Sequence, residues 1–251
     1  MIGVFDSGSG GLTVVRAIRE RLPHADILYF GDIKNAPYGE KTPEELSRLT
    51  IEGIKLLIDH GATSIVSACN SVSASLALSL FDALDLEPDR LIEMVGPTVS
   101  YVKDSPARIL LVATPATVRS GIYQNAFRMI GKEVTAIAIP ELARHIEFGS
   151  LDEEIKTTMS EALDKLPEDI DTLILACTHY PLVYDMFRRA VPERVMVFDP
   201  AEAVAERVER RFWPREAGNG TTTCMISKES PIFRSFAKRV LPDSVQIKVL
   251  S

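Results

Sequence analysis

The stretches TSIVSACN at residues 63–70 and DTLILACTH at residues 171–179 each place a cysteine directly after an apolar, strand-like run. These cysteines, Cys69 and Cys177, lie 108 positions apart. Similar strand-like runs recur at this spacing: RILLVA corresponds to IGVFD, and TAIAIP corresponds to ILYFGD. We therefore expect two similar halves that each present one thiol from the same topological position. Such a pair suits a reaction that needs an acid on one face of the substrate and a base on the other face.

Short apolar runs alternate with longer segments of helical period. IGVF precedes LTVVRAIRERL, ILYF precedes PEELSRLTIEGIKLLIDHG, and SIVSA precedes SVSASLALSLFDAL at residues 71–84. This alternation is typical of parallel strands joined by helices. We expect an α/β fold of two similar domains related by pseudo-two-fold symmetry, each a mainly parallel sheet flanked by helices. The active site should lie between the domains, beyond the carboxyl ends of the strands.

The expected domain boundaries come from a break in this pattern. Gly96 and Pro97 interrupt the alternation, which begins again at RILLVA. We expect a first domain of residues 1–96 plus 207–251, with the C-terminal segment packing back on it. The second domain should span residues 97–206.

Composition narrows the class of ligand. The chain has 251 residues with 28 basic and 35 acidic side chains, and no basic patch or tail. We therefore expect a small-molecule substrate and no nucleic-acid partner. Three widely spaced cysteines form no disulfide framework, which is typical of a reducing compartment. No apolar run approaches the ~20 residues of a membrane span and no signal segment is evident, so we expect a cytoplasmic protein without membrane contact.

The first glycine-rich loop, residues 6–11, follows a strand and precedes a helix. A dinucleotide fingerprint counted from Gly8 needs a sixth-position glycine where Thr13 stands, and a phosphate loop of the Walker type needs an absent lysine. The loop instead suits an amino acid, with Asp6 near the ammonium group and Ser7 near a carboxylate. The alternative is that both residues only cap the following helix.

Two more loops follow strand-like runs. Pro37, Tyr38 and Gly39 form a turn whose tyrosine can close over a small ligand. The alternative is a plain turn with a surface tyrosine. Thr114, Thr117 and Ser120 occupy the second-half counterpart of the glycine loop. They suit carboxylate binding or, equally, helix capping.

The paired cysteines are followed by polar residues in both halves. A thiol that faces a helix N-terminus has its thiolate favoured, and adjacent polar groups can hold a carboxylate. These neighbours are Asn70, Ser71, Thr178 and His179. The alternatives are two buried apolar cysteines, a zinc site from Cys69, Cys177 and His179, and a Cys–His acyl-transfer nucleophile. The zinc site would have only Cys-x-His as local ligand spacing, and the nucleophile would leave Cys69 without a role.

Several other candidates remain. The carboxylate of Glu147 could lie behind the site and support it. The alternative is a solvated charge at a helix end. The residues His24, His60, His145 and Cys224 have no partner pattern and are expected to be structural.

The motifs occur in an order that resembles the cofactor-independent glutamate racemases. They are FDSGSGGLTV, the segment from Asp32 to Gly39, ACNS, the run from Thr114 to Tyr123, Glu147, CTHYPL and FDPA. The chain differs from that family's usual pattern in Ser71, Val72 and Ala176. Aspartate racemases have a similar fold and paired cysteines, but usually carry glutamate at the position of His179 and lack the Pro-Tyr-Gly segment.

The resemblance implies that the chain interconverts L- and D-glutamate by two-base proton transfer at the α-carbon, which would supply D-glutamate for peptidoglycan. Cys177 would deprotonate L-glutamate and Cys69 D-glutamate, with Asp6 and His179 assisting. The implied substrate-binding residues are Asp6, Ser7, Pro37, Tyr38, Gly39, Asn70, Ser71, Thr114, Thr117, Thr178 and His179. No metal, pyridoxal phosphate or other cofactor is expected. We expect the chain to form a homodimer. The alternatives are a racemase of another amino acid such as aspartate, and a catalytically silent binding homologue.

Overall fold

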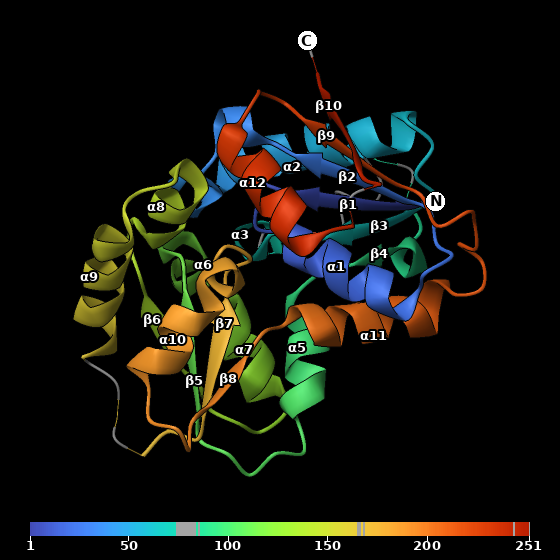
Figure 1. Cartoon of the computed structure of the whole chain (residues 1–251). Coiled ribbons are helices and arrows are strands. Elements are labelled where there is room, and N and C mark those ends of the chain that lie inside the picture. Colours follow the sequence, from blue (N-terminus) through green and yellow to red (C-terminus); the bar gives the residue numbers. More distant parts are fainter. Residues whose placement is uncertain (74–83, 85, 165–166, 168, 243, 251) are drawn as a thin grey trace.

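The computed structural model describes residues 1–73, 84, 86–164, 167, 169–242 and 244–250. Within them the chain forms two parallel sheets flanked by helices (Figure 1). The strand orders are β10-β9-β2-β1-β3-β4 in the larger sheet and β6-β5-β7-β8 in the smaller. This confirms the expected α/β fold. The helix expected over residues 71–84 lies largely outside the described residues.

The strands are short and mostly buried. The larger sheet contains β1 (Ile2–Asp6), β2 (Ile27–Gly31), β3 (Ser64–Ser67), β4 (Leu91–Ile92), β9 (Thr222–Ile226) and β10 (Gln246–Val249). The smaller sheet contains β5 (Ile109–Ala113), β6 (Thr135–Ala138), β7 (Thr172–Ala176) and β8 (Met196–Phe198). The central strands are apolar on both sides because helices cover both faces.

The repeat seen in the sequence is also a repeat of topology. The order β2-β1-β3-β4 in one sheet matches β6-β5-β7-β8 in the other. Ile2 pairs with Ile27 in the first half, and Leu110 pairs with Thr135 in the second, so this register keeps the same offset. The strands that precede the two cysteines, β3 and β7, therefore occupy equivalent positions beside the central strands.

The helices alternate with these strands. They are α1 (Leu12–Arg21), α2 (Pro43–Asp59), α3 (Asn70–Ser73), α5 (Val95–Val102), α6 (Pro115–Ser120), α7 (Ile122–Met129), α8 (Leu142–Phe148), α9 (Asp152–Leu163), α10 (Tyr184–Ala190), α11 (Ala201–Phe212) and α12 (Pro231–Val240). Short 3₁₀ turns include η2 (Tyr38–Glu40) and η4 (Tyr180–Val183). Capping residues set the N-terminal ends of two of these helices. Thr42 and Glu45 form a capping box on α2, and Ser230 caps α12.

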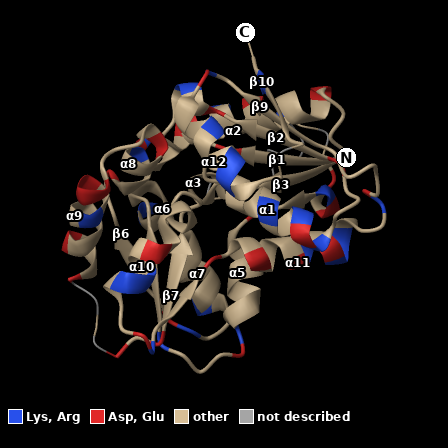
Figure 2. Ribbon diagram, viewed as in Figure 1, with Lys and Arg blue, Asp and Glu red and all other residues tan. Residues whose placement is uncertain are grey.

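The charged side chains lie on the helices and loops around these sheets. Figure 2 shows Lys and Arg interspersed with Asp and Glu along α1 and α11, whereas the central strands carry few charges. Within the described part of the chain, no helix combines the length and the apolar character needed to cross a membrane.

The C-terminal segment joins the larger sheet. β9 pairs with β2, β10 pairs with β9, and the Phe233 ring of α12 lies 5.9 Å from the Tyr29 ring. Helix α11 contributes Val204 to a core beneath the larger sheet and Ala203 to a core of the smaller one. We propose that the domains divide within α5 and α11, as 1–96 plus 207–251 and 97–206.

One tight contact generates a stability prediction. Gly53 in α2 lies against the Phe5 ring, which a Cβ at that position would overlap. We expect Gly53→Ala to lower the free energy of unfolding by about 1–3 kcal/mol, because overpacking outweighs the gain in helix propensity. Urea unfolding checks this. Lys55→Ala on the exposed face of the same helix should change stability by less than about 0.5 kcal/mol, and a Gly53→Ala variant as stable as wild type would contradict the packing argument.

Candidate active site

Both cysteines of the repeat lie at the carboxyl edges of the two sheets and line one small cavity. Cys69 follows β3 and is 4% exposed, and Cys177 directly follows β7 and is 5% exposed. The cavity is lined by Ser7, Pro37, Tyr38, Gly39, Cys69, Asn70, Ser71, Thr114, Ala143, Cys177, Thr178 and His179. All except Ala143 are candidates named from the sequence. The structure therefore brings together residues from six separate segments.

The cavity is narrow in this structure. Its volume is about 10 Å³, which is about the least that one water molecule needs. One wall comes from loops of the larger sheet and the other from loops of the smaller sheet. An amino acid can enter only if these two walls move apart.

Asp6 links the two halves. It is fully buried, with Oδ1 accepting from the Gly8 amide at 2.9 Å and Oδ2 accepting from the Thr178 hydroxyl at 2.9 Å. Helix α1 begins only at Leu12, and no side chain caps it. Asp6 instead holds the glycine loop and Thr178 of the other half.

The first thiol has an environment that favours its neutral form. Burial, together with the nearby charge of Asp6, raises the pKa of Cys69 to about 12. The Cys69 thiol donates to Ser7 Oγ at 3.7 Å. Burial likewise raises the pKa of Asp6, against the opposing effect of His179. This environment therefore favours the neutral thiol of Cys69.

The second thiol belongs to a chain of buried groups. His179 Nδ1 lies 3.9 Å from Cys177 Sγ, and His179 Nε2 lies 2.6 Å from Glu147 Oε2. Glu147 also accepts from the amide of Ser9 at 2.7 Å and from its hydroxyl at 3.1 Å. Glu147 is 1% exposed, so the alternative of a solvated helix-end charge is wrong. Glu147 does not line the cavity but contacts His179, which does.

The charge of His179 follows from these contacts. Burial disfavours the imidazolium ion, but hydrogen bonds to Cys177 and Glu147 and the charge of Glu147 outweigh it and raise the pKa of His179 well above its usual value. These contacts favour the imidazolium form of His179. A cation beside a sulfur favours the thiolate.

A cluster of hydroxyl groups forms another part of the cavity. Ser71 Oγ lies 2.9 Å from Thr114 Oγ1, which lies 3.0 Å from Thr117 Oγ1. Thr114 also caps α6 by accepting from the Thr117 amide at 3.4 Å. The two roles expected for Thr114, capping and facing the site, are thus compatible. Thr117 is buried in the cluster behind the cavity wall.

Asn70 carries an unpaired donor. Its Oδ1 accepts from the Tyr123 hydroxyl at 2.6 Å, whereas its Nδ2 is buried and has no partner among the described residues. Asn70 is 2% exposed and lines the cavity. Buried donors without a partner are rare in proteins. This amide group is therefore suited to a ligand oxygen.

Tyr38 is buried, which rules out the alternative of a surface tyrosine. Its hydroxyl donates to Asp32 Oδ2 at 2.7 Å, and Ser227 donates to Asp32 Oδ1 at 2.8 Å. Gly39 lies against Thr114 of the other half, where a Cβ would be 2.7 Å from Thr114 Cβ. The ring of Tyr38 thus forms part of the cavity wall, and Asp32 fixes its hydroxyl group.

Sequence reasoning missed several supporting residues. Ser9, which binds Glu147, lies inside the glycine loop that drew attention to Asp6 and Ser7. Asp32 and Tyr123 lie within the motifs that carry the family resemblance, although no role was expected for them. Ala143 offered no signal, because an alanine in a helix has no distinctive chemistry.

The expected structural residues lie elsewhere. His24, His60, His145 and Cys224 do not line the cavity. In the described part of the chain, His, Cys, Asp and Glu side chains form no group of three or more placed to hold a metal ion.

Comparisons with known proteins agree with this geometry. Residues 12–208 match the family model described as Asp/Glu/Hydantoin racemase. A glutamate racemase from Aquifex aeolicus is 34% identical over 251 residues, which covers 100% of this chain and 97% of that protein. The crystal structure of a glutamate racemase from Bacillus anthracis aligns with a TM-score of 0.89 at 29% identity, covering 100% of this chain and 97% of the other.

A second solved structure was determined with a ligand. Glutamate racemase from Francisella tularensis, in complex with D-glutamate, aligns with a TM-score of 0.86 at 27% identity and covers 100% of this chain and 97% of that one. These findings confirm the resemblance that the motifs suggested. The roles of individual residues in the cavity stay predictions.

The Glu147–His179 pair generates a prediction about pH. Glu147→Gln should lower the pKa of His179 toward its usual value, because the partner loses its negative charge. Folding raises this pKa, so the pair stabilises the protein fully below about pH 6.5 and loses that contribution as the pH rises through the folded-state value. The stability gap between wild type and variant should therefore narrow at alkaline pH.

NMR titration of the histidine ring protons measures the shift, with the His179 signal identified by its loss in His179→Asn. Glu161→Gln, an exposed change on α9, is the control and should leave the titration unchanged. An unaltered His179 titration in Glu147→Gln would contradict the assignment of the cause.

Proposed function

Because the chain belongs to the Asp/Glu/Hydantoin racemase family, we propose that it interconverts L-glutamate and D-glutamate by proton transfer at the α-carbon between Cys69 and Cys177. The observation that carries this proposal is the placement of two buried thiols in one cavity, each from the same position of a repeated sheet. Inversion of a carbon centre needs a base and an acid on opposite faces. Two thiols from facing halves meet that requirement.

The proposed reaction moves one proton to Cys177 and one proton from Cys69. In the L-to-D direction, the Cys177 thiolate beside protonated His179 takes the α-proton, and the Cys69 thiol donates its proton to the opposite face of the carbanion. After turnover Cys177 is a thiol and Cys69 is a thiolate. The D-to-L reaction reverses these roles. Exchange of the thiol protons with solvent introduces solvent hydrogen at the α-carbon.

The polar residues suit the two ends of an amino acid. The free Nδ2 of Asn70 and the hydroxyl groups of Ser71 and Thr114 can bind a carboxylate. Asp6, expected near the ammonium group, is buried behind the cavity wall and holds Thr178 of that wall. Donors on the α-carboxylate also stabilise the negative charge that develops when the α-proton leaves. The proposed chemistry therefore uses the side chains of this chain and no cofactor.

The setting of the reaction is part of the proposal. The support for a reducing compartment is that all three cysteines are free and buried, so we place the enzyme in the cytoplasm. The family resemblance supports a homodimer and the use of D-glutamate in peptidoglycan. Analytical ultracentrifugation of the purified chain would measure its assembly state.

The proposed reaction is tested by proton exchange. In deuterium oxide the wild-type protein should replace the α-proton of both glutamate enantiomers with deuterium, as measured by NMR and mass spectrometry. A panel with aspartate and other amino acids determines the substrate. If no amino acid in the panel loses its α-proton, the racemase assignment fails.

The two-thiol mechanism is tested by substitution. Cys69→Ser and Cys177→Ser should each lower the rate of racemisation by at least about 1,000-fold, because removing one general acid or base forfeits its contribution. Any remaining exchange should be confined to L-glutamate in Cys69→Ser and to D-glutamate in Cys177→Ser. Cys224→Ala is the matched control, since Cys224 is also free and buried but lies outside the cavity, in β9. Full turnover by either single serine variant would rule out the mechanism.

A further inference from the structure

Helix α12 near the C-terminus packs against both halves of the molecule. Phe236 and Val240 of this helix contact the core beneath the larger sheet and also a core of the smaller sheet. Phe233, on the buried side, lies against Tyr29 of β2. The helix is thus anchored on the larger sheet and reaches the smaller one, which carries Cys177.

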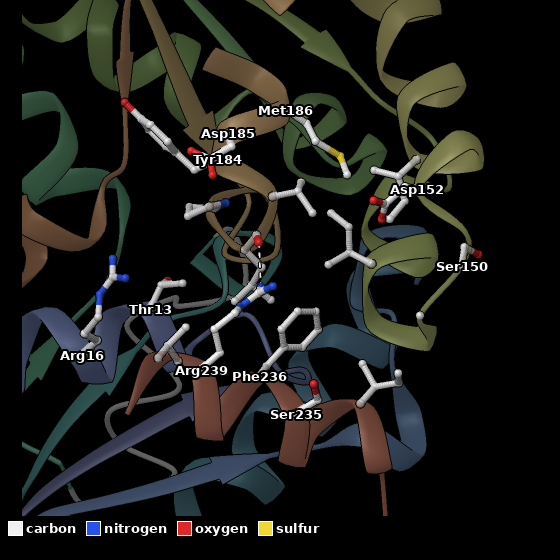
Figure 3. A pocket seen from close by; sticks show the side chains of 18 residues that line it. Thr13, Arg16, Ser150, Asp152, Tyr184, Asp185, Met186, Ser235, Phe236 and Arg239 are labelled. Atoms are coloured by element: carbon white, nitrogen blue, oxygen red, sulfur yellow. Dashed lines mark hydrogen bonds between the residues drawn. The ribbon is translucent and has the colours of Figure 1, made fainter. Parts of the chain in front are cut away.

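A single arginine of α12 binds the segment that follows Cys177. Arg239 Nη2 donates to the main-chain carbonyl of Leu182 at 2.8 Å. Its guanidinium group lies 4.8 Å from the centre of the Phe236 ring, which fixes the direction of the side chain. Figure 3 shows this hydrogen bond as a dashed line from Arg239.

The acceptor lies one short turn from the catalytic residues. Leu182 belongs to η4, and its amide donates to the carbonyl of His179 at 3.0 Å. The Tyr180 amide donates to the carbonyl of Cys177 at 3.1 Å. These hydrogen bonds connect η4 to the main chain of both the cysteine and the histidine.

Helix α12 also touches the helix that carries Glu147. At the end of α8, Gly149 adopts a left-handed conformation with a φ of 72°. A Cβ at this position would overlap the side chain of Ile232 in α12. The same helix therefore approaches the supports of both Glu147 and His179, which are hydrogen-bonded to each other.

The hydrogen bond of Arg239 crosses a cavity where little other packing joins the two halves. The cavity, of about 570 Å³, lies between α1 and α12 on one side and α8, α9 and α10 on the other. Figure 3 shows the side chains that line it. Side chains do not fill this space, so apolar packing across it is weaker than in a continuous core. Arg239 and Leu182 both line it. Their hydrogen bond spans the gap between the halves directly beside η4.

We propose that Arg239 is a positioning residue that holds η4, and through it Cys177 and His179, in the geometry needed for proton transfer. It does not contact the cavity that holds the two thiols. This role rests on the proposed racemase function. It predicts an asymmetric defect, because Arg239 supports the thiol of the smaller sheet and not Cys69.

The test compares the two half-reactions in Arg239→Ala. We expect kcat/KM to fall about 10- to 100-fold, since small misplacements of reacting groups have effects of this size. The two enantiomers have equal free energy, so kcat/KM must fall equally in both directions. The primary isotope effect of α-deuterated substrate distinguishes the two proton transfers. It should rise for L-glutamate, whose proton goes to Cys177, and fall for D-glutamate.

Two variants control for general damage. Arg239→Lys retains a donor and should restore part of the activity. Arg234→Ala, on the same helix, removes an arginine that pairs with Glu229 at 2.7 Å near the surface, and should behave as wild type. Isotope effects that stay unchanged in both directions, or an equal defect in Arg234→Ala, would overturn the proposal.

A second measurement does not depend on activity. Hydrogen–deuterium exchange should quicken at the amides of Tyr180 and Leu182 in Arg239→Ala, while the peptide around Cys69 keeps its wild-type rate. If wild type fails to exchange the α-proton of any amino acid, the proposed function fails, and amide exchange alone decides the role of Arg239. Unchanged exchange in η4 would overturn that role whatever the activity of the protein.

Discussion

The buried carboxylate of Glu147 is the group on which the rest of the site depends. It accepts hydrogen bonds from Ser9 in a loop of the larger sheet and from His179 in a loop of the smaller sheet. A buried charge without partners costs several kcal/mol. The partners of Glu147 come together only when the two sheet edges meet. The same carboxylate thus joins the contact between the two halves to the pair formed by His179 and Cys177.

Similar backbones carry different electrostatics in the two halves. Cys69 and Cys177 occupy equivalent positions, yet Cys69 faces the negative charge of Asp6 and Cys177 faces His179. The repeat thus supplies the symmetry of position that a reaction between mirror images requires. The side chains differ between the halves, with an acidic neighbour beside Cys69 and a histidine beside Cys177.

The α/β fold could be predicted from strand periodicity and from the repeat that relates Cys69 to Cys177. Most of the cavity residues could be predicted only with the family resemblance added to these patterns. The supporting contacts could not. Ser227 reaches Asp32 across 195 positions of sequence, and its place depends on β9 joining β2. Ala143 lines the cavity only because α8 presents it there. Such contacts follow from how the halves and the C-terminal segment assemble, which no local pattern encodes.

The small volume of the cavity has a kinetic consequence. Substrate and product are mirror images with equal free energy, so the chemical step provides no driving force for release. A site that encloses both enantiomers equally well must let either one out by the same motion that admits it. The frequency with which the two walls separate therefore sets an upper limit on turnover. Any molecule or substitution that slows this separation would reduce the rate in both directions by the same factor, without touching either sulfur.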